Sequence, residues 1–418
     1  MYKLRDIENC LEEASKSFEA IVIYGARQVG KSTTAKHIFK KGFSYVTLDD
    51  PDELLLALTN PKGFLEIHPW PVLIDEVQKA PILLSLIKKI IDEERERRLD
   101  SGSKRQIMYV LTGSNRFELQ EGISESLAGR AAIFEMGSLT QIESIGKKGS
   151  LFWPDIATLL KKEKDCGIPY ANQKEIFERI WRGGMPEIAI NNVSRDLYFK
   201  SYFETYLEKD VRKLISASSE MAFRRFLFYL ALRTAQQVNY EVFARELGVD
   251  SATIKRWLSI LQTSGILVLL EPYMAHISNR IIKAPKLYFM DTGLCAFLCK
   301  WPSAEMLSEC AMSGAFFETF VVSEIVKSFW NSLKDPSGTL FYYRDIDQKE
   351  IDLIYVEANC IYPIEIKKGI APNKPTKNFN VLSKYHMEIK PGLVIDCTDK
   401  IRPINEFAYS FPVYLLGI

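Results

Sequence analysis

Five short apolar runs in the first third of the chain alternate with longer segments of helical pattern. The runs cover residues 20–24, 43–48, 72–74, 107–111 and 132–135. Each run has the length and the β-branched or aromatic content of a buried strand, and segments such as 81–97 have the pattern of a helix. This alternation predicts an α/β domain with a mostly parallel sheet. Polar residues gather where the runs end, which is the edge at which open parallel sheets hold ligands.

The middle of the chain has a mainly helical pattern, beginning with the helix-rich segment 138–214. Three further helices are predicted at 223–232, 240–247 and 253–262, followed by a strand at 266–270. Asn239 and Asp250 stand where they can cap the second and third of these helices. This order predicts a winged helix-turn-helix. Lys255 and Arg256 are the only cations of the third helix, so DNA contact and contact with another part of the protein both stay open.

The last hundred residues contain a second candidate site on a predicted hairpin. Strands are predicted at 340–344, 350–356 and 361–367, and the last two meet at a turn around Ala358-Asn359. If the hairpin is symmetric, Asp352 lies opposite Glu365, and Lys367 shares their face because side chains alternate along a strand. Charges that converge between apolar residues are costly unless they bind something. Two other interpretations of these converging charges are a solvated face with a salt bridge and a domain that binds DNA without cutting it.

The most specific motif of the chain lies at residues 25–32. The segment Gly25-Ala26-Arg27-Gln28-Val29-Gly30-Lys31-Ser32 fits the phosphate-binding loop G-x-x-x-x-G-K-[ST], after a predicted strand and before a predicted helix. Glycines let the backbone close around phosphates, and N–H groups supply the positive field. Lys31 is expected to reach the β- and γ-phosphates, and Ser32 to ligate Mg²⁺. We therefore predict ATP and Mg²⁺ as cofactors. The predicted nucleotide-binding residues are Gly25, Arg27, Gln28, Val29, Gly30, Lys31, Ser32 and Thr33.

Two further polar segments follow predicted strands and resemble parts of an ATPase. Asp75 and Glu76 resemble a Walker B motif, in which Asp75 belongs to the Mg²⁺ shell and Glu76 polarises the attacking water. The segment 112–115 resembles the sensor-1 position. Ser114 or Asn115 would place the water beside the γ-phosphate, and the sequence does not choose between them.

The order of the strands and the glutamate after the Walker B aspartate resemble AAA+ and related signal-transducing ATPases. In that resemblance Arg130 stands where such ATPases present an arginine finger, which stabilises charge on the transferring phosphoryl group. A solvated surface arginine is the alternative. Residues 183–186 resemble the Gly-x-Pro turn of the lid, with Arg182 as a sensor-2 candidate. A simple helix break explains the same residues equally well.

Composition narrows the setting in which this chain works. Its 418 residues are too many for one core, and 54 Lys+Arg against 53 Asp+Glu give a net charge of +1. That balance argues neither for nor against nucleic acid. Seven scattered cysteines do not form a disulfide framework, and no apolar run approaches membrane-spanning length. We therefore expect a cytoplasmic protein with no membrane partner.

Taken together, these motifs resemble one family of prokaryotic AAA+-type P-loop ATPases that carry a C-terminal restriction-endonuclease-like domain of unknown function. The segments that carry the resemblance are 25–32, 75–78, 127–130, 183–186, 202–211, 286–294 and the tail residues. In related PD-(D/E)xK nucleases, the residues matching Asp352 and Glu365 hold Mg²⁺, and the one matching Lys367 orients or activates water. Glu318 would add an outer acid.

The resemblance implies a multidomain α/β protein. The expected domains are a P-loop ATPase core at 1–137, a helical lid at 138–215, a winged helix at 216–300 and a PD-(D/E)xK-like domain at 301–418. One function is an ATPase coupled to a DNA-associated nuclease module. The other is a nucleotide-switched signalling or scaffold ATPase whose C-terminal domains bind a protein partner or DNA without cleavage. DNA, a protein partner and further copies of the chain are the candidate partners.

Overall fold

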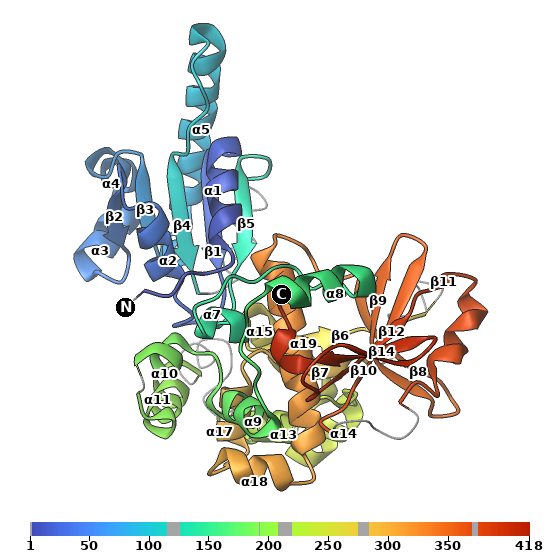
Figure 1. Ribbon diagram of the computed structural model, residues 1–418. Coiled ribbons are helices and arrows are strands. Elements are labelled where there is room, and N and C mark those ends of the chain that lie inside the picture. Colours follow the sequence, from blue (N-terminus) through green and yellow to red (C-terminus); the bar gives the residue numbers. More distant parts are fainter. Residues whose placement is uncertain (1, 115–125, 192, 208–219, 275–283, 370–374) are drawn as a thin grey trace.

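The computed structural model describes residues 2–114, 126–191, 193–207, 220–274, 284–369 and 375–418. Two β-sheets lie on either side of a mainly helical region (Figure 1). The sheet of the N-terminal third is drawn in blue and teal, and the sheet of the C-terminal third in orange and red.

The N-terminal sheet is parallel and has the strand order β2-β3-β4-β1-β5. Its strands are β1 (Ala20–Tyr24), β2 (Ser44–Thr47), β3 (Val72–Asp75), β4 (Tyr109–Gly113) and β5 (Ala131–Glu135). Its helices are α1 (Glu8–Ser17), α2 (Lys31–Ile38), α3 (Pro51–Thr59), α4 (Pro61–Ile67) and α5 (Ile82–Ser101). Strands β1, β3 and β4 are buried along their whole length, which explains their nearly continuous apolar sequences. The predicted P-loop α/β fold is confirmed.

Helices follow the first sheet, as the periodicity predicted. They are α7 (Gln141–Ser144), α8 (Ile156–Asp165), α9 (Gln173–Arg182), α10 (Pro186–Asn191), α11 (Arg195–Tyr202) and the π-helical turn η2 (Phe203–Leu207). Thr140 and Asn172 begin α7 and α9 with capping boxes, in which each cap and the glutamate three residues later bond to one another's backbone N–H. This region stands where a lid was predicted, and its boundaries as a domain stay a prediction.

The next segment has the predicted order of three helices and a strand, followed by a second strand that was not predicted. It comprises α13 (Glu220–Leu232), α14 (Tyr240–Leu247), α15 (Ser251–Thr263), β6 (Leu267–Leu270) and β7 (Lys286–Phe289). Asn239 and Asp250 cap α14 and α15 through their side chains. Strands β6 and β7 pair antiparallel as a two-stranded sheet. Its identity as a winged helix stays a prediction.

The C-terminal sheet has seven strands, four more than the sequence indicated. The helices before it are α17 (Thr292–Leu298), α18 (Ala304–Glu309) and α19 (Ser313–Asn331). The strands are β8 (Leu340–Arg344), β9 (Glu350–Glu357), β10 (Cys360–Ile366), β11 (Glu388–Ile389), β12 (Gly392–Asp396), β13 (Arg402–Asn405) and β14 (Ala408–Pro412). Their order is β13-β14-β12-β10-β9-β8, with β11 beside β10. Strand β11 has two residues and β13 is exposed throughout, so neither has the apolar pattern from which a strand is predicted.

The C-terminal region is joined to the first sheet through the segment that follows β5. Gln141 donates its side-chain amide to the carbonyls of Val413 (2.7 Å) and Leu416 (3.2 Å). Its backbone N–H donates to Glu324 of α19 at 2.7 Å, and Lys327 of the same helix donates to the Leu139 carbonyl at 3.2 Å. These contacts fix α19 against the rim of the first sheet.

None of the helices in the described part of the chain is long and apolar enough to cross a membrane. All seven cysteines are free thiols.

Candidate functional site

The loop between β1 and α2 has the conformation that its glycines allow. Gly25 has φ 148° and Gly30 has φ 99°, and Gln28 between them also has a positive φ of 62°. A Cβ on Gly25 would lie 2.1 Å from the Met136 carbonyl oxygen, so no larger residue fits there. The loop therefore depends on glycine both for its curvature and for its close contact with the end of β5.

Lys31 lies inside this loop, and among the described residues its hydrogen-bond partners are neutral. Its ammonium group donates to the carbonyl oxygens of Gly25 (3.0 Å) and Ala26 (2.8 Å), and the residue is 5% exposed. Burial lowers the pKa of Lys31 to about 8, although Glu76 and Asp75 oppose that shift. A buried cation is costly without an anion, which agrees with the predicted role of Lys31; that role stays a prediction.

Asp75 and Ser32, the predicted Mg²⁺ ligands, lie in contact. The Ser32 hydroxyl donates to Asp75 Oδ1 at 2.7 Å. Tyr45 of β2 donates to Oδ2 at 3.0 Å, and Thr112 of β4 donates to Oδ1. All are oxygen donors, the type that Mg²⁺ prefers, so the residues fit this ion. Neither Tyr45 nor the role of Thr112 could be predicted from the sequence, because each residue stands on a different strand from Asp75.

Glu76 and Ser114 also lie together, at the carboxyl ends of β3 and β4. The Ser114 hydroxyl donates to Glu76 Oε2 at 2.9 Å. The Gln78 amide donates to the same carboxylate and to Ser114 Oγ, the latter at 3.3 Å. Asn115 lies outside the described residues. The structure therefore places Ser114 beside Glu76, the predicted water-activating residue. Gln78 contacts both residues, although the sequence analysis assigned it no role within the motif at 75–78.

The remaining predicted nucleotide-binding residues are Arg27, Val29 and Thr33. Val29 is buried and Arg27 is half-buried, whereas Thr33 is exposed on α2. The Val29 carbonyl accepts a hydrogen bond at 2.8 Å from Arg5, a residue that the sequence did not single out.

The Gly-Gly-Met-Pro turn reaches the P-loop, as expected from the resemblance to a lid. A Cβ on Gly30 would lie 3.9 Å from Pro186 Cγ. The turn itself is held by Asp291, which accepts from the Gly184 N–H at 2.9 Å and from the Leu294 N–H at 3.0 Å. The carboxylate of Asp291 thus caps α17 and fixes the turn beside the phosphate loop at the same time.

The turn between α15 and β6 also touches the P-loop. A Cβ on Gly265 would lie 3.2 Å from the Ala26 backbone nitrogen. The predicted winged helix therefore faces the ATPase domain at this turn.

Arg130 is paired within its own domain. Its guanidinium donates Nε to Asp92 Oδ1 at 2.6 Å and Nη2 to Asp92 Oδ2 at 2.8 Å. This is a bidentate ion pair at the surface of α5. The role of Arg130 as an arginine finger stays a prediction, and it would require this pair to open.

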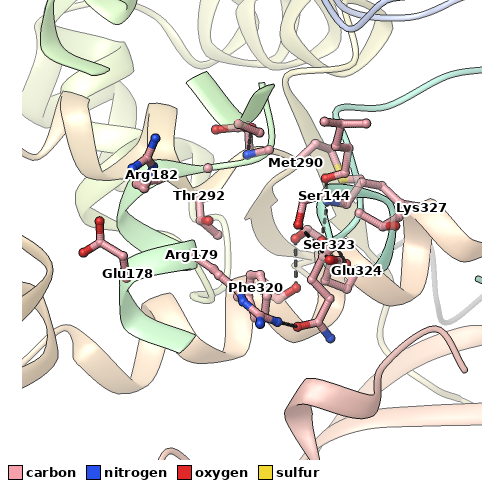
Figure 2. Close-up of a pocket in the computed structure, with 17 residues that line it drawn as sticks. Ser144, Glu178, Arg179, Arg182, Met290, Thr292, Phe320, Ser323, Glu324 and Lys327 are labelled. Atoms are coloured by element: carbon pink, nitrogen blue, oxygen red, sulfur yellow. Dashed lines mark hydrogen bonds and ion pairs between the residues drawn. The ribbon is translucent and has the colours of Figure 1, made fainter. Parts of the chain in front are cut away.

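Arg182 lines a cavity of about 170 Å³ between α9 and α19 (Figure 2). It donates to the Ile188 carbonyl at 3.1 Å. Arg179 lies on the same wall and donates to the Gln141 side chain at 3.0 Å, while Glu324 lies across the cavity. The sensor-2 role of Arg182 stays a prediction.

The tail residues Asp352, Glu365 and Lys367 converge as the hairpin predicted. The antiparallel register pairs Ile364 with Leu353, which continues to Glu365 opposite Asp352. Lys367 Nζ lies 2.8 Å from Asp352 Oδ2 and 2.7 Å from Glu365 Oε2.

The two carboxyl groups of this cluster titrate in opposite directions. Burial and the nearby Asp352 carboxylate raise the pKa of Glu365 to about 9. Burial also disfavours the charged form of Asp352, but the ammonium groups of Lys367 and Lys286 hold the pKa of Asp352 below its usual value. The pair therefore shares one negative charge near neutral pH.

Glu318 and Lys286 extend the cluster. Glu318, from α19, accepts from Lys286 Nζ at 3.0 Å and from the Tyr288 hydroxyl at 2.7 Å, and burial raises the pKa of Glu318 to about 7. Lys286 also pairs with Glu350 and is 2% exposed. Lys286 belongs to β7, far from the tail in sequence, and the sequence did not predict it here.

In the described part of the chain, no three His, Cys, Asp or Glu side chains are arranged to hold a metal ion. The metal-binding roles of Asp352, Glu365 and Glu318, and the catalytic role of Lys367, stay predictions.

Comparison with known families gives a match for the first third of the chain. A family model described as "AAA domain" matches residues 17–145. The N-terminal domain is an AAA-type ATPase domain. The matched residues include the P-loop, Asp75, Glu76 and Ser114. In the structure, Ser32 of the P-loop contacts Asp75, and Ser114 contacts Glu76. Two families described as domains of unknown function match residues 173–305 (DUF8612) and 313–416 (DUF4143).

Two relatives are similar to the AAA domain and to much of the rest of the chain. They are uncharacterized proteins of Mycobacterium bovis and Mycobacterium tuberculosis, each 26% identical over 385 residues, which cover 88% of this chain and 75% of theirs.

Solved structures show only distant likeness. The Walker-type ATPase of Pyrococcus abyssi has a TM-score of 0.40 and 13% identity, over 70% of this chain and 94% of its own. DnaA from Aquifex aeolicus bound to AMPPCP has a TM-score of 0.26 and 14% identity, over 61% of this chain and 85% of its own. At such TM-scores we draw no conclusion from either likeness.

Proposed function

We propose that this protein is an Mg²⁺-dependent ATPase in which Lys31 binds the phosphates and Glu76 activates the attacking water. The observation that carries the proposal is the buried Lys31 ammonium group, which hydrogen-bonds to two backbone carbonyls and has no acidic hydrogen-bond partner in the part of the chain that the structure describes. Carbonyls are neutral acceptors, and a hydrogen bond from an ammonium group to a charged phosphate oxygen is stronger than one to a carbonyl. Replacing the carbonyls by phosphate therefore lowers the free energy of the site.

The neighbouring acids support the same reaction. Ser32 and Asp75 supply the oxygen atoms that would hold Mg²⁺, and the ion would neutralise charge on the phosphate oxygens. Glu76 accepts a hydrogen bond from Ser114 at 2.9 Å, which directs its carboxylate toward the end of β4. A water bound there would be aligned for attack on the γ-phosphate.

Purified protein incubated with ATP and Mg²⁺ tests the proposal. Phosphate release should depend on Mg²⁺ and disappear with EDTA. The absence of ATP binding by the intact protein would refute it.

We further propose that the tail is a nuclease-like module that associates with DNA in the cytoplasm. The support is the convergence of Asp352, Glu365 and Lys367 on one face. Metal-dependent cleavage would require Lys286 and Lys367 to release their carboxylates. The complete pairing of those carboxylates favours the alternative, in which the tail binds DNA or a protein partner without cleavage and ATP acts as a switch.

Incubation of the protein with Mn²⁺, ATP and single- or double-stranded DNA separates these two forms of the proposal. Cleavage that is lost in Lys367→Ala supports the nuclease. DNA binding without cleavage supports the switch.

A further inference from the structure

The N-terminal segment before α1 contacts the P-loop through one buried arginine. Arg5 is 6% exposed and its guanidinium makes three hydrogen bonds. Nη1 donates to the Val29 carbonyl at 2.8 Å, Nη2 to the Gly137 carbonyl at 2.9 Å and Nε to Glu143 Oε1 at 3.0 Å. Arg5 therefore ties the P-loop to the segment that follows β5.

The bond to Val29 bears on the direction of an N–H group in the loop. In a trans peptide the C=O of Val29 and the N–H of Gly30 point in opposite directions. A P-loop binds phosphate through N–H groups that point into the loop, so the carbonyl of the same peptide has to point outward. Arg5 holds that carbonyl on the outside.

This peptide is one that could turn over without such a bond. Rotation of the Val29–Gly30 peptide changes φ of Gly30, and glycine accepts positive and negative φ almost equally. Gly30 has φ 99° in the structure. The glycine that lets the loop curl therefore also makes its orientation easy to lose, and a bond from a charged donor offsets that freedom.

Arg5 is itself held rigidly. Glu143 is fully buried and accepts from Arg5 Nε, from the Asp6 N–H at 2.7 Å and from the Thr140 N–H at 2.8 Å. A buried ion pair with these extra bonds fixes the guanidinium in one position.

We propose that Arg5 is a positioning residue of the phosphate site, which orients the Val29–Gly30 peptide so that the Gly30 N–H faces the bound polyphosphate. This inference rests on the proposed ATP binding. Arg5 does not touch the nucleotide, and its effect is on affinity for the phosphates rather than for the base.

Arg5→Lys tests the inference, because lysine keeps a cation beside Glu143 but cannot reach three acceptors at once. The dissociation constants of ATP and of inorganic tripolyphosphate should both rise about tenfold, by the same factor. The matched control is Arg98→Lys. It weakens another buried arginine–glutamate pair of the same domain, Arg98 Nη2 with Glu19 Oε1 at 2.6 Å, and should lower the thermal midpoint while both dissociation constants stay unchanged.

If Arg5→Lys does not fold, the double variant Arg5→Gln/Glu143→Gln removes both charges together and should show the same loss of affinity. Unchanged affinity in the folded Arg5 variant would overturn the inference while leaving ATP binding intact. Affinity that falls in step with the thermal midpoint, in Arg98→Lys as well, would also overturn it. Failure of the wild-type protein to bind either ligand would instead refute the proposed function itself.

Discussion

The ATP site and the tail cluster contain similar residues but treat their charges differently. In the ATP site, Lys31 donates to backbone carbonyls and Asp75 accepts from hydroxyl groups. Neither residue has an ion-pair partner within the part of the chain that the structure describes. In the tail, Lys367 lies within 2.8 Å of Asp352 and within 2.7 Å of Glu365.

The difference separates a site prepared for a charged ligand from one that supplies its own counter-ions. Unpaired buried charges cost free energy, which a ligand of opposite charge recovers on binding. Paired buried charges have already recovered it, and a ligand must first break the pairs. MgATP would bind at a site of unpaired charges. A metal ion in the tail would first have to break the existing ion pairs.

The comparison is tested most strongly by Lys31→Ala. Loss of the buried Lys31 ammonium group should weaken ATP binding at least about 100-fold, since two or more charge-assisted bonds are lost. Lys40→Ala, at an exposed position just beyond α2, is the control and should bind ATP normally. Calorimetric titration of the folded variants measures both. Normal binding by Lys31→Ala would remove the basis of the comparison.

Arg130 sharpens the comparison by asking whether a second cation reaches the ATP site from another copy of the chain. Arg130→Ala should lower kcat about 1000-fold if it is an arginine finger. Mixing Arg130→Ala with Lys31→Ala protein should restore some activity, because one site of a mixed dimer has both residues. A mixture that stays inactive, although differently tagged copies co-purify, would leave Arg130 as the surface partner of Asp92.

Glu76→Gln separates binding from chemistry in the ATP site. Asp75 and Ser32 remain, so ATP and Mg²⁺ should still bind, whereas hydrolysis should slow about 100-fold because the water loses its base. Single-turnover phosphate release measures the chemical step. Asp352→Asn serves as a control and should hydrolyse ATP at the wild-type rate. Unchanged turnover in Glu76→Gln would assign water activation to another residue.

Lys286→Met tests the pairing on the tail side. It leaves Glu318 without its cation and Glu350 with Arg344 alone, so it should lower the free energy of unfolding by about 3 kcal/mol. The vacated place should then accept Mn²⁺, so added Mn²⁺ should restore stability in this variant more than in the wild type. Denaturant unfolding with and without Mn²⁺ measures the effect. A variant indifferent to Mn²⁺ would show that Lys286 does not stand in for a metal ion.

The smallest expected effects are on pH dependence, and the two sites should differ in sign. Glu318 and Glu365 have pKa values raised from 4.5 to about 7 and about 9. Their stabilising contribution is therefore complete below pH 4.5 and lost as the pH rises through those values. Hydrogen exchange of the β9 and β10 amides should report this decline. Glu365→Gln should remove the part of this decline that occurs near pH 9.

Lys31 behaves in the opposite way. Its pKa is lowered from 10.5 to about 8, so the penalty for its buried charge disappears as the pH rises from about 8 to 10.5. ATP affinity should fall over the same range, because the ammonium group that binds phosphate loses its proton. Constant affinity from pH 7 to 10 would contradict the role of Lys31.

What the sequence could predict follows from how its signals are distributed. The P-loop is one contiguous segment, and the Asp352, Glu365 and Lys367 face follows from the period of two residues in a strand. Arg5 and Lys286 could not be found in this way. Each is a single residue whose partners lie far away along the chain, such as Glu143, 138 positions from Arg5. Nothing in the local pattern distinguishes Arg5 from a surface cation, and the segment 286–294 carried the family resemblance without assigning a partner to Lys286.

The pair of Arg130 and Asp92 illustrates the same limit. The motif at 127–130 predicts a functional arginine, but the helix that carries its partner contributes no motif. Only the packing of α5 beside the sheet brings the two side chains together.

Counting bound Mn²⁺ by electron paramagnetic resonance tests the central claim most directly. The account predicts one ion per chain, present only with ATP, lost in Asp75→Ala and retained in Asp352→Asn. An ion that binds without ATP and disappears in Asp352→Asn would contradict it, because the tail would then be the site that awaits a charged ligand.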